Sequence, residues 1–431
     1  MDYMEKQGWL VVFGGVLIFL MLGITYTWSV FSGPLVEKYG WSQTEVQLAF
    51  SFMLAMFALS MIPAGMIQDR KGPRIVALIG GILLGVGFIA TSMFANSPLM
   101  LYITYGILCG CGVGFAYVTP IAAGVKWFGN RKGLVSGIIV FGFGFGSLIF
   151  APVAQKLIEM QGITQTFLIL GIVLGAVVCL GAMLLKNPPL KPANASSVSC
   201  EVGPRQMLSN TRFWTLWIMF AFSAAAGLMV IGNLATFAKI SFTTVHGMDK
   251  AAAASLAALA VGALAIFNGA GRILAGWLSD RIGRQKTMLT MFGLQAILLW
   301  TVLFSSGLSP WALFASMALI GLCFGANFSL FPSATADFFG TKNMGVNYGL
   351  VFTAYGFGGI LGPQVMAYML DAAKASKGSL AVGDYATPFL LVGGLVAISA
   401  IVSLFTGPCE TAVTKPEAVA RAKTAGSGKT R

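Results

Sequence analysis

Residues 65–74 read GMIQDRKGPR and residues 276–286 read GWLSDRIGRQK, so the pattern G-x-x-x-D-R-x-G occurs twice in the chain. Asp69 of the first copy and Asp280 of the second lie 211 residues apart. The same offset separates three further glycine pairs: Gly72 and Gly283, Gly110 and Gly321, and Gly129 and Gly340. Landmarks that repeat at one offset indicate two homologous halves.

The composition excludes a soluble protein. Of the 431 residues, 57% are hydrophobic and 10% are charged, whereas about a quarter of an ordinary soluble domain is charged. Disorder is excluded as well, because disordered chains have low hydrophobicity. The surroundings of most of this chain are therefore expected to be lipid.

Twelve nearly uncharged stretches are long enough to cross a bilayer as helices. The sequence therefore predicts an all-α membrane protein of twelve transmembrane helices in two pseudo-symmetric six-helix bundles. Because each half has an even number of helices, both halves have the same orientation. The predicted spans are 9–31, 44–67, 75–95, 99–122, 134–155, 164–185, 213–240, 251–278, 287–306, 310–335, 345–370 and 386–406.

The placement of lysine and arginine predicts the topology. With twelve spans, 20 basic residues fall on one side of the membrane and 6 on the other. The positive-inside rule then places both termini in the cytoplasm of a multi-pass protein of the plasma (inner) membrane. The net charge of +13 is explained by this bias and requires no nucleic-acid partner. The expected units are an N-terminal half (1–185), a polar cytoplasmic linker (186–212), a C-terminal half (213–406) and a disordered basic cytoplasmic tail (407–431).

One basic residue, Arg272, lies inside a predicted span, in GALAIFNGAGRILAGWLSD. It is eight residues before Asp280, about 12 Å from the helix end, and all fourteen acidic residues lie in loops, tails or helix ends. A buried arginine stays charged, so an anionic substrate is its natural counter-ion. The alternative is that Arg272 extends to the cytoplasmic face and only braces its helix. Asn268, on the same helix face, could bind the substrate or another helix.

The two repeated loops place an acid at a helix end, where arginines and the neighbouring helix terminus can meet it. We expect such clusters to latch a cytoplasmic gate, although the charges could instead serve only as topology anchors. The pattern resembles the cytoplasmic loop signature of the major facilitator superfamily. The expected gate residues are Asp69, Arg70, Arg74, Asp280, Arg281 and Arg284.

Further segments resemble the oxalate/formate antiporter family of these facilitators, which is related to the monocarboxylate porters. They are FNGAGRxxxGxxSDRIGR at 267–284, NYG at 347–349, YTW at 26–28, GVGFAY at 112–117 and FPSATADFFG at 331–340. The resemblance implies that Arg272 binds a substrate carboxylate. It also implies that Phe324 and Phe328 line the cavity, with Tyr26 and Tyr117 as candidates from the N-terminal half.

The chain departs from the family at Tyr355, where the family's oxalate transporters carry a lysine. One cation in the site suits one negative charge, because a second anionic group would be unmatched in a low dielectric. The expected function is therefore secondary active transport of monocarboxylates of the lactate, pyruvate, formate or acetate class. The alternatives are an oxalate/formate-type or other dicarboxylate exchanger and, in another class, a non-transporting membrane sensor on the same fold.

Proton coupling is expected, although the predicted spans hold no acid at mid-membrane and the single histidine, His246, falls in an external loop. The substrate itself could carry the proton, and obligatory exchange fits the same scheme. No catalytic set, metal site or cofactor is expected, so the chain should not be an enzyme. Its expected partners are a small organic anion, protons and the lipid bilayer, and its expected functional state is a monomer.

Overall fold

The computed structural model describes residues 3–189 and 201–407, and almost all of them are helical. The first half comprises α1 (Tyr3–Leu22), the 3-10 helix η1 (Gly23–Thr27), α2 (Trp28–Tyr39), α3 (Gln43–Lys71), α4 (Pro73–Phe94), α5 (Pro98–Leu101), the π-helix η2 (Tyr102–Cys109), α6 (Gly110–Trp127) and α7 (Lys132–Leu184). The second comprises α8 (Pro204–Leu208), α9 (Thr211–Thr244), α10 (Lys250–Ile282), α11 (Arg284–Leu308), α12 (Pro310–Phe339), α13 (Met344–Lys377), η3 (Val382–Tyr385) and α14 (Ala386–Ser403).

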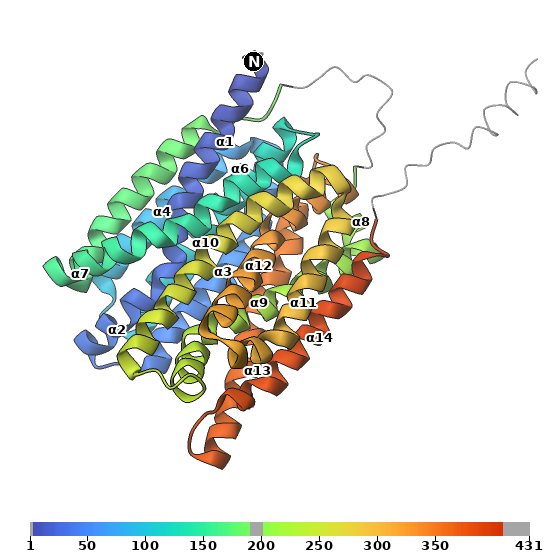
Figure 1. Ribbon diagram of the computed structural model, residues 1–431. Helices are drawn as coiled ribbons and strands as arrows, with labels where there is room; N and C mark the ends of the chain where they lie inside the picture. The colour runs from blue at the N-terminus through green and yellow to red at the C-terminus, as the bar shows by residue number, and fades with distance from the viewer. Residues whose placement is uncertain (1–2, 190–200, 408–431) are drawn as a thin grey trace, which may run out of the picture.

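Eleven helical segments of the described chain are long and apolar enough to cross a membrane. One of them, α7, has 53 residues, which would span about 80 Å if straight, far more than the roughly 30 Å of a hydrocarbon core. The chain reverses at Gly162, whose φ of 78° suits glycine, and Figure 1 shows α7 doubling back. Since α7 thus contains two predicted spans, the expected twelve-span, all-helical fold is confirmed.

The helices extend beyond the predicted spans at their charged ends. The span predicted at 44–67 continues as α3 to Lys71, so that Asp69 and Arg70 belong to its last turn. The span predicted at 9–31 continues through α2 to Tyr39 and is interrupted by η1. A helix can extend beyond the hydrocarbon into water, so a charge does not mark where it ends.

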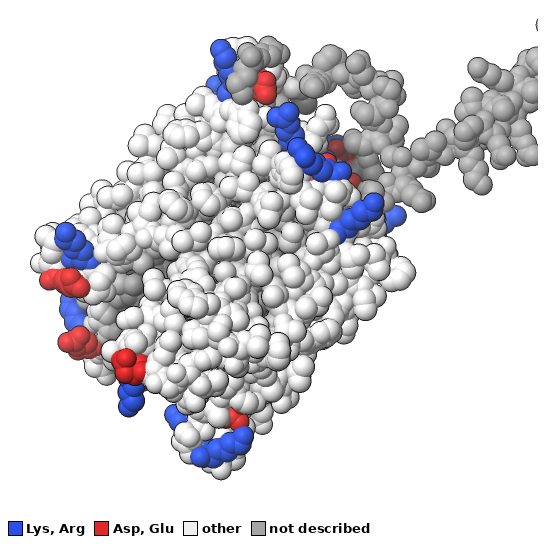
Figure 2. Space-filling view, in the orientation of Figure 1, with Lys and Arg blue, Asp and Glu red and all other residues white. Residues whose placement is uncertain are grey.

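The two halves meet along two helix pairs, α3 against α13 and α7 against α10. Both ends of the described chain lie at one end of the bundle, which we call the terminal end (Figure 1). In Figure 2, charged side chains gather at the two ends and leave the flank between them uncharged. Such a band is what a bilayer requires of a protein surface.

The linker and tail are described only in part. Residues 186–189 and 201–212 of the expected linker are described, and they include the short α8 and the start of α9. Residues 190–200 lie outside the described chain, as do residues 408–431, so the expected disorder of the tail falls outside the described residues.

Candidate functional site

Arg272 lies in α10 at the junction of the two halves, and its side chain is 0% exposed. Among residues 3–189 and 201–407, it is the only buried residue with a charged side chain. Its Nε donates to Oδ1 of Asn268 at 3.1 Å, and its Nη1 donates to the carbonyl oxygen of Val140 in α7 at 2.5 Å. Nη2 makes no hydrogen bond within the described chain. Arg272 therefore joins the two halves, and the geometry excludes the reading in which it extends to water.

Aromatic rings surround the guanidinium. Its Cζ lies 4.5 Å from the ring centroid of Phe328 and 5.9 Å from that of Phe143, distances at which the ring face attracts a cation. Phe324 packs edge-on against Phe328 at 5.4 Å, and its ring fills the space that Gly227 of α9 leaves free. Phe324 thus supports the wall that Phe328 presents to Arg272.

Four tyrosines from both halves lie around this centre. The hydroxyls of Tyr26, in η1, and Tyr355, in α13, are 3.3 Å apart. The hydroxyls of Tyr117, in α6, and Tyr348, in α13, face one another, and neither makes a hydrogen bond to any other described residue. The two rings that face the guanidinium also contact three of these tyrosines. Phe143 packs against Tyr26 and Tyr117, and Phe328 packs against Tyr355. The structure thus brings every expected central residue to one place.

Sequence reasoning missed three of the groups in this centre: Val140, Phe143 and Tyr348. Val140 contributes only its carbonyl oxygen, for which a sequence carries no signal. Phe143 is one of 33 phenylalanines, and nothing in the spacing separates it from the others. Tyr348 belongs to the NYG segment that the resemblance singled out, so that segment could have drawn attention to it.

Asp69, at the end of α3, reaches the start of α13 in the other half. Its Oδ1 accepts from the backbone N–H of Gly345 at 3.1 Å, and its Oδ2 accepts from that of Val346 at 3.0 Å. Lys126 lies 3.3 Å from Oδ1. A carboxylate at a helix N-terminus satisfies free N–H groups and matches the helix dipole.

Asp280, at the end of α10, makes the equivalent contact from the second half to the first. Its two carboxylate oxygens accept from the N–H groups of Gly133 and Leu134 at 2.9 and 2.8 Å, at the start of α7. Arg284 Nη1 lies 2.8 Å from Asp280 Oδ1. The repeated aspartates thus exchange contacts between the halves, and we call the two contacts the Asp69 latch and the Asp280 latch.

The Asp280 latch has an additional acid that sequence reasoning did not assign to it. Asp337, in α12, accepts from Lys132 and from Arg284, each at 2.7 Å. The repeat offset aligns Asp337 with Lys126, so the two latches differ in charge at this position. Charges near helix ends are readily explained as topology signals, so sequence reasoning did not assign Lys126, Lys132 and Asp337 to the gate.

The other three expected gate arginines lie outside the latches. Arg74 donates to the carbonyl oxygen of Met183 at 2.7 Å, within the first half. Arg281 is exposed, with its guanidinium 4.1 Å from the ring of Trp277. Arg70 is exposed and forms no hydrogen bond or ion pair with a described residue. Of the six residues expected at the gate, the structure places Asp69, Asp280 and Arg284 in the latches.

Glycines allow backbone contact between the halves at the terminal end. A Cβ on Gly276 would lie 2.1 Å from the carbonyl oxygen of Gly133, and one on Gly65 would lie 2.2 Å from the carbonyl carbon of Gly345. Cβ atoms do not approach other atoms so closely, so only glycine permits this packing. The terminal end is therefore closed by close helix contacts as well as by the latches.

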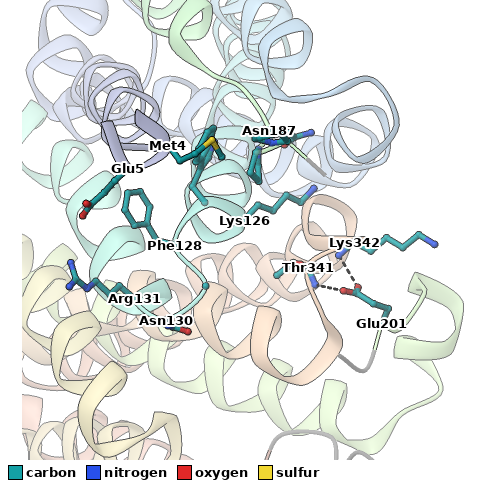
Figure 3. Close-up of a pocket in the computed structure, with 14 residues that line it drawn as sticks. Met4, Glu5, Lys126, Phe128, Asn130, Arg131, Asn187, Glu201, Thr341 and Lys342 are labelled. Carbon is teal, nitrogen blue, oxygen red and sulfur yellow. Dashed lines mark hydrogen bonds between the residues drawn. The ribbon is translucent and has the colours of Figure 1, made fainter. Parts of the chain in front are cut away.

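A cleft of about 860 Å³ opens at the terminal end beside the Asp69 latch. Figure 3 shows the carboxylate of Glu201, from the linker, accepting from the backbone N–H groups of Thr341 and Lys342 at 3.3 and 2.8 Å. Val202 accepts from the side-chain amide of Asn347 at 3.0 Å. The end of the linker is thus hydrogen-bonded to the segment that precedes α13. Asp69 caps the N-terminus of that same helix.

Residues 13–363 match the family described as Major Facilitator Superfamily. The uncharacterized MFS-type transporter YhjX of Escherichia coli (strain K12) is 31% identical over 83% of this chain and 87% of its own length. The oxalate:formate antiporter of Oxalobacter formigenes is 30% identical over 83% and 84%, and monocarboxylate transporter 11 of Homo sapiens is 26% identical over 90% and 80%. The crystal structure of the facilitator FucP in the outward conformation has a TM-score of 0.67 at 16% identity and covers 92% of this chain and 98% of its own. With its fold and its repeated halves, the chain belongs to the major facilitator superfamily.

Proposed function

We propose that this multi-pass membrane protein is a secondary active transporter of small monocarboxylates, the class of lactate, pyruvate, formate and acetate. The observation that carries the proposal is Arg272, a fully buried cation whose Nη2 has no partner among the described residues. A carboxylate would supply the missing negative charge and would accept hydrogen bonds from the free N–H groups of Arg272. The names of two relatives, the oxalate:formate antiporter and monocarboxylate transporter 11, are consistent with an organic anion as substrate.

The number of cations favours one negative charge. No second lysine or arginine is buried within the described chain, and Tyr355 occupies the position at which the family's oxalate transporters carry a lysine. An oxalate dianion would leave one carboxylate without a cationic partner in a low dielectric. The rival function is therefore oxalate/formate-type exchange, favoured by the 30% identity to the oxalate:formate antiporter.

Transport proceeds by alternating access, with the terminal end facing the cytoplasm. Because the latches and glycine contacts join the halves at this end, we assign them to the cytoplasmic gate. An empty Arg272 resists reorientation because it binds Val140 of the other half and remains an unneutralised charge. Binding of the anion neutralises Arg272 and lets one half rock against the other.

Proton coupling is part of the proposal, with the proton carried by the substrate. Obligatory exchange of anions is the competing scheme. In liposomes, an imposed pH gradient should drive accumulation of labelled lactate without any internal anion. If the gradient drives no accumulation while an internal anion does, symport is wrong and exchange is correct.

The site assignment is tested by Arg272→Gln in the same liposomes. Uptake of labelled lactate should be abolished while the yield and melting temperature of the purified protein stay near those of the wild type. Arg205→Gln is the matched control, because Arg205 is an exposed arginine in α8, and it should leave uptake unchanged. Full uptake by Arg272→Gln would reject the assignment, and competition by oxalate stronger than by pyruvate would favour the rival function.

A further inference from the structure

Two buried phenolic hydroxyls near Arg272 have no hydrogen-bond partner other than each other. Tyr117, in α6, and Tyr348, in α13, come from opposite halves, and their side chains are 1% and 0% exposed. Beyond that mutual contact, neither hydroxyl makes a hydrogen bond within residues 3–189 and 201–407, and Nη2 of Arg272 makes none there. A contact between two phenols uses only one of their two O–H donors, and an unsatisfied polar group is costly in a buried site. The remaining O–H and Nη2 therefore mark where the polar atoms of a ligand bind.

We propose that Tyr348 determines substrate specificity and that, together with Tyr117, it binds an oxygen on carbon 2 of the substrate. The site then selects 2-hydroxy and 2-oxo monocarboxylates over plain alkyl carboxylates of the same size. This inference rests on the proposed function, since it takes Arg272 as the group that binds the carboxylate.

The hydrogen-bond donors of Arg272 suffice for the carboxylate. Its Nε donates a hydrogen bond to Asn268, and one N–H of Nη1 donates to the carbonyl oxygen of Val140. The second N–H of Nη1 and both N–H groups of Nη2 remain. A carboxylate can accept two parallel hydrogen bonds from the N–H groups of a guanidinium. The two phenols are therefore left for a different oxygen of the substrate.

A pair of phenols suits both oxidation states of carbon 2. A phenol can donate one hydrogen bond and can also accept one. A 2-hydroxyl can therefore donate to one tyrosine and accept from the other, whereas a 2-oxo group can accept from both. Propionate and acetate have no oxygen at carbon 2, so they leave one O–H of the phenol pair without an acceptor.

The neighbours explain why this role falls to Tyr348 rather than to Tyr355. The hydroxyl of Tyr355 lies 3.3 Å from that of Tyr26 and so has a partner. The ring of Phe352 packs against both Tyr117 and Tyr348, with centroids at 5.0 and 5.7 Å, and offers their hydroxyls no acceptor. Tyr348 also lies seven residues before Tyr355, about 10 Å nearer the terminal end. It therefore forms the floor of the site, between Arg272 and the Asp69 latch.

The test is Tyr348→Phe in liposomes, with lactate and propionate as a substrate pair that differs by one hydroxyl. The KM for labelled lactate should rise about 5-fold, the effect of one neutral hydrogen bond. The inhibition constant of propionate should stay within about 2-fold of the wild-type value. Tyr368→Phe is the matched control, because Tyr368 is on the same helix and 77% exposed; it should change neither value.

An equal loss for lactate and propionate would overturn the inference, since Tyr348 would then contact the carboxylate or only support the fold. No change for lactate would overturn it as well. If Tyr348→Phe does not fold, Tyr117→Phe must show the same selective loss or the inference fails. These outcomes leave the proposed function standing, whereas lactate transport that survives Arg272→Gln would reject the proposed function itself.

Discussion

Neutralising the Asp280 latch should open the terminal end of the protein. Asp280→Asn keeps one carbonyl oxygen for Gly133 but replaces the other acceptor with an NH₂ group that faces the N–H of Leu134. It also removes the charge that pairs with Arg284 at 2.8 Å. Both side chains are only 10% exposed, so solvent screens these interactions weakly.

The expected magnitude follows from these contacts. A hydrogen bond to a charged group contributes about 1.5–3 kcal/mol, and the contacts with Gly133 and Leu134 exist only while the end is closed. Loss of the Leu134 bond should shift the closed–open equilibrium by about 2 kcal/mol, or roughly 30-fold. The ion pair with Arg284 lies within the second half and therefore does not add to this shift.

The assay is a distance distribution between spin labels on the two halves at the terminal end. Positions 71 and 286 are suitable because both lysines are exposed, with the native cysteines replaced beforehand. Asp280→Asn should move the population toward longer distances. Asp384→Asn is the matched control, because Asp384 also accepts a backbone N–H and pairs with a lysine, but at the opposite end. Wild-type distances in a folded Asp280→Asn protein would refute the assignment of the latch.

Two further predictions concern packing and selectivity. Gly276→Ala should also lengthen the distances between the spin labels, because its Cβ would lie 2.1 Å from the Gly133 carbonyl oxygen. Gly262→Ala in the same helix should not lengthen them, since nothing lies within 4 Å of a Cβ at that position. Equal effects of the two variants would contradict the packing argument. Tyr355→Lys adds a second cation to the site, so oxalate should compete with labelled lactate at least about 10-fold better than in the wild type. Unchanged oxalate competition in that variant would show that cation number does not set the preferred charge.

The sequence predicted the helices well because membrane spans are long apolar runs, which can be seen directly along the chain. It predicted less of what joins the halves. The repeated aspartates were expected to meet a neighbouring helix terminus, but no spacing could reveal that Asp69 caps α13 and Asp280 caps α7 in the opposite half. Pairing between halves depends on three-dimensional packing, which a periodic pattern does not encode.

The central site was predicted in part for the same reason. Arg272 stood out because a charge inside a span is rare, whereas an aromatic residue there is common. Tyr348 could not be distinguished by residue type, and its role depends on its hydroxyl meeting no described group other than Tyr117. Asn268 was expected to face the substrate or another helix, and the structure shows it binding Arg272 within α10.

The central claim is that Arg272 binds the carboxylate of the transported anion. Equilibrium binding of labelled L-lactate to the purified protein measures this directly, without dependence on gating or coupling. The wild type and Arg205→Gln should bind lactate saturably, with pyruvate displacing the label, and Arg272→Gln should show no saturable binding while keeping its melting temperature. Wild-type affinity in a folded Arg272→Gln protein would contradict the account.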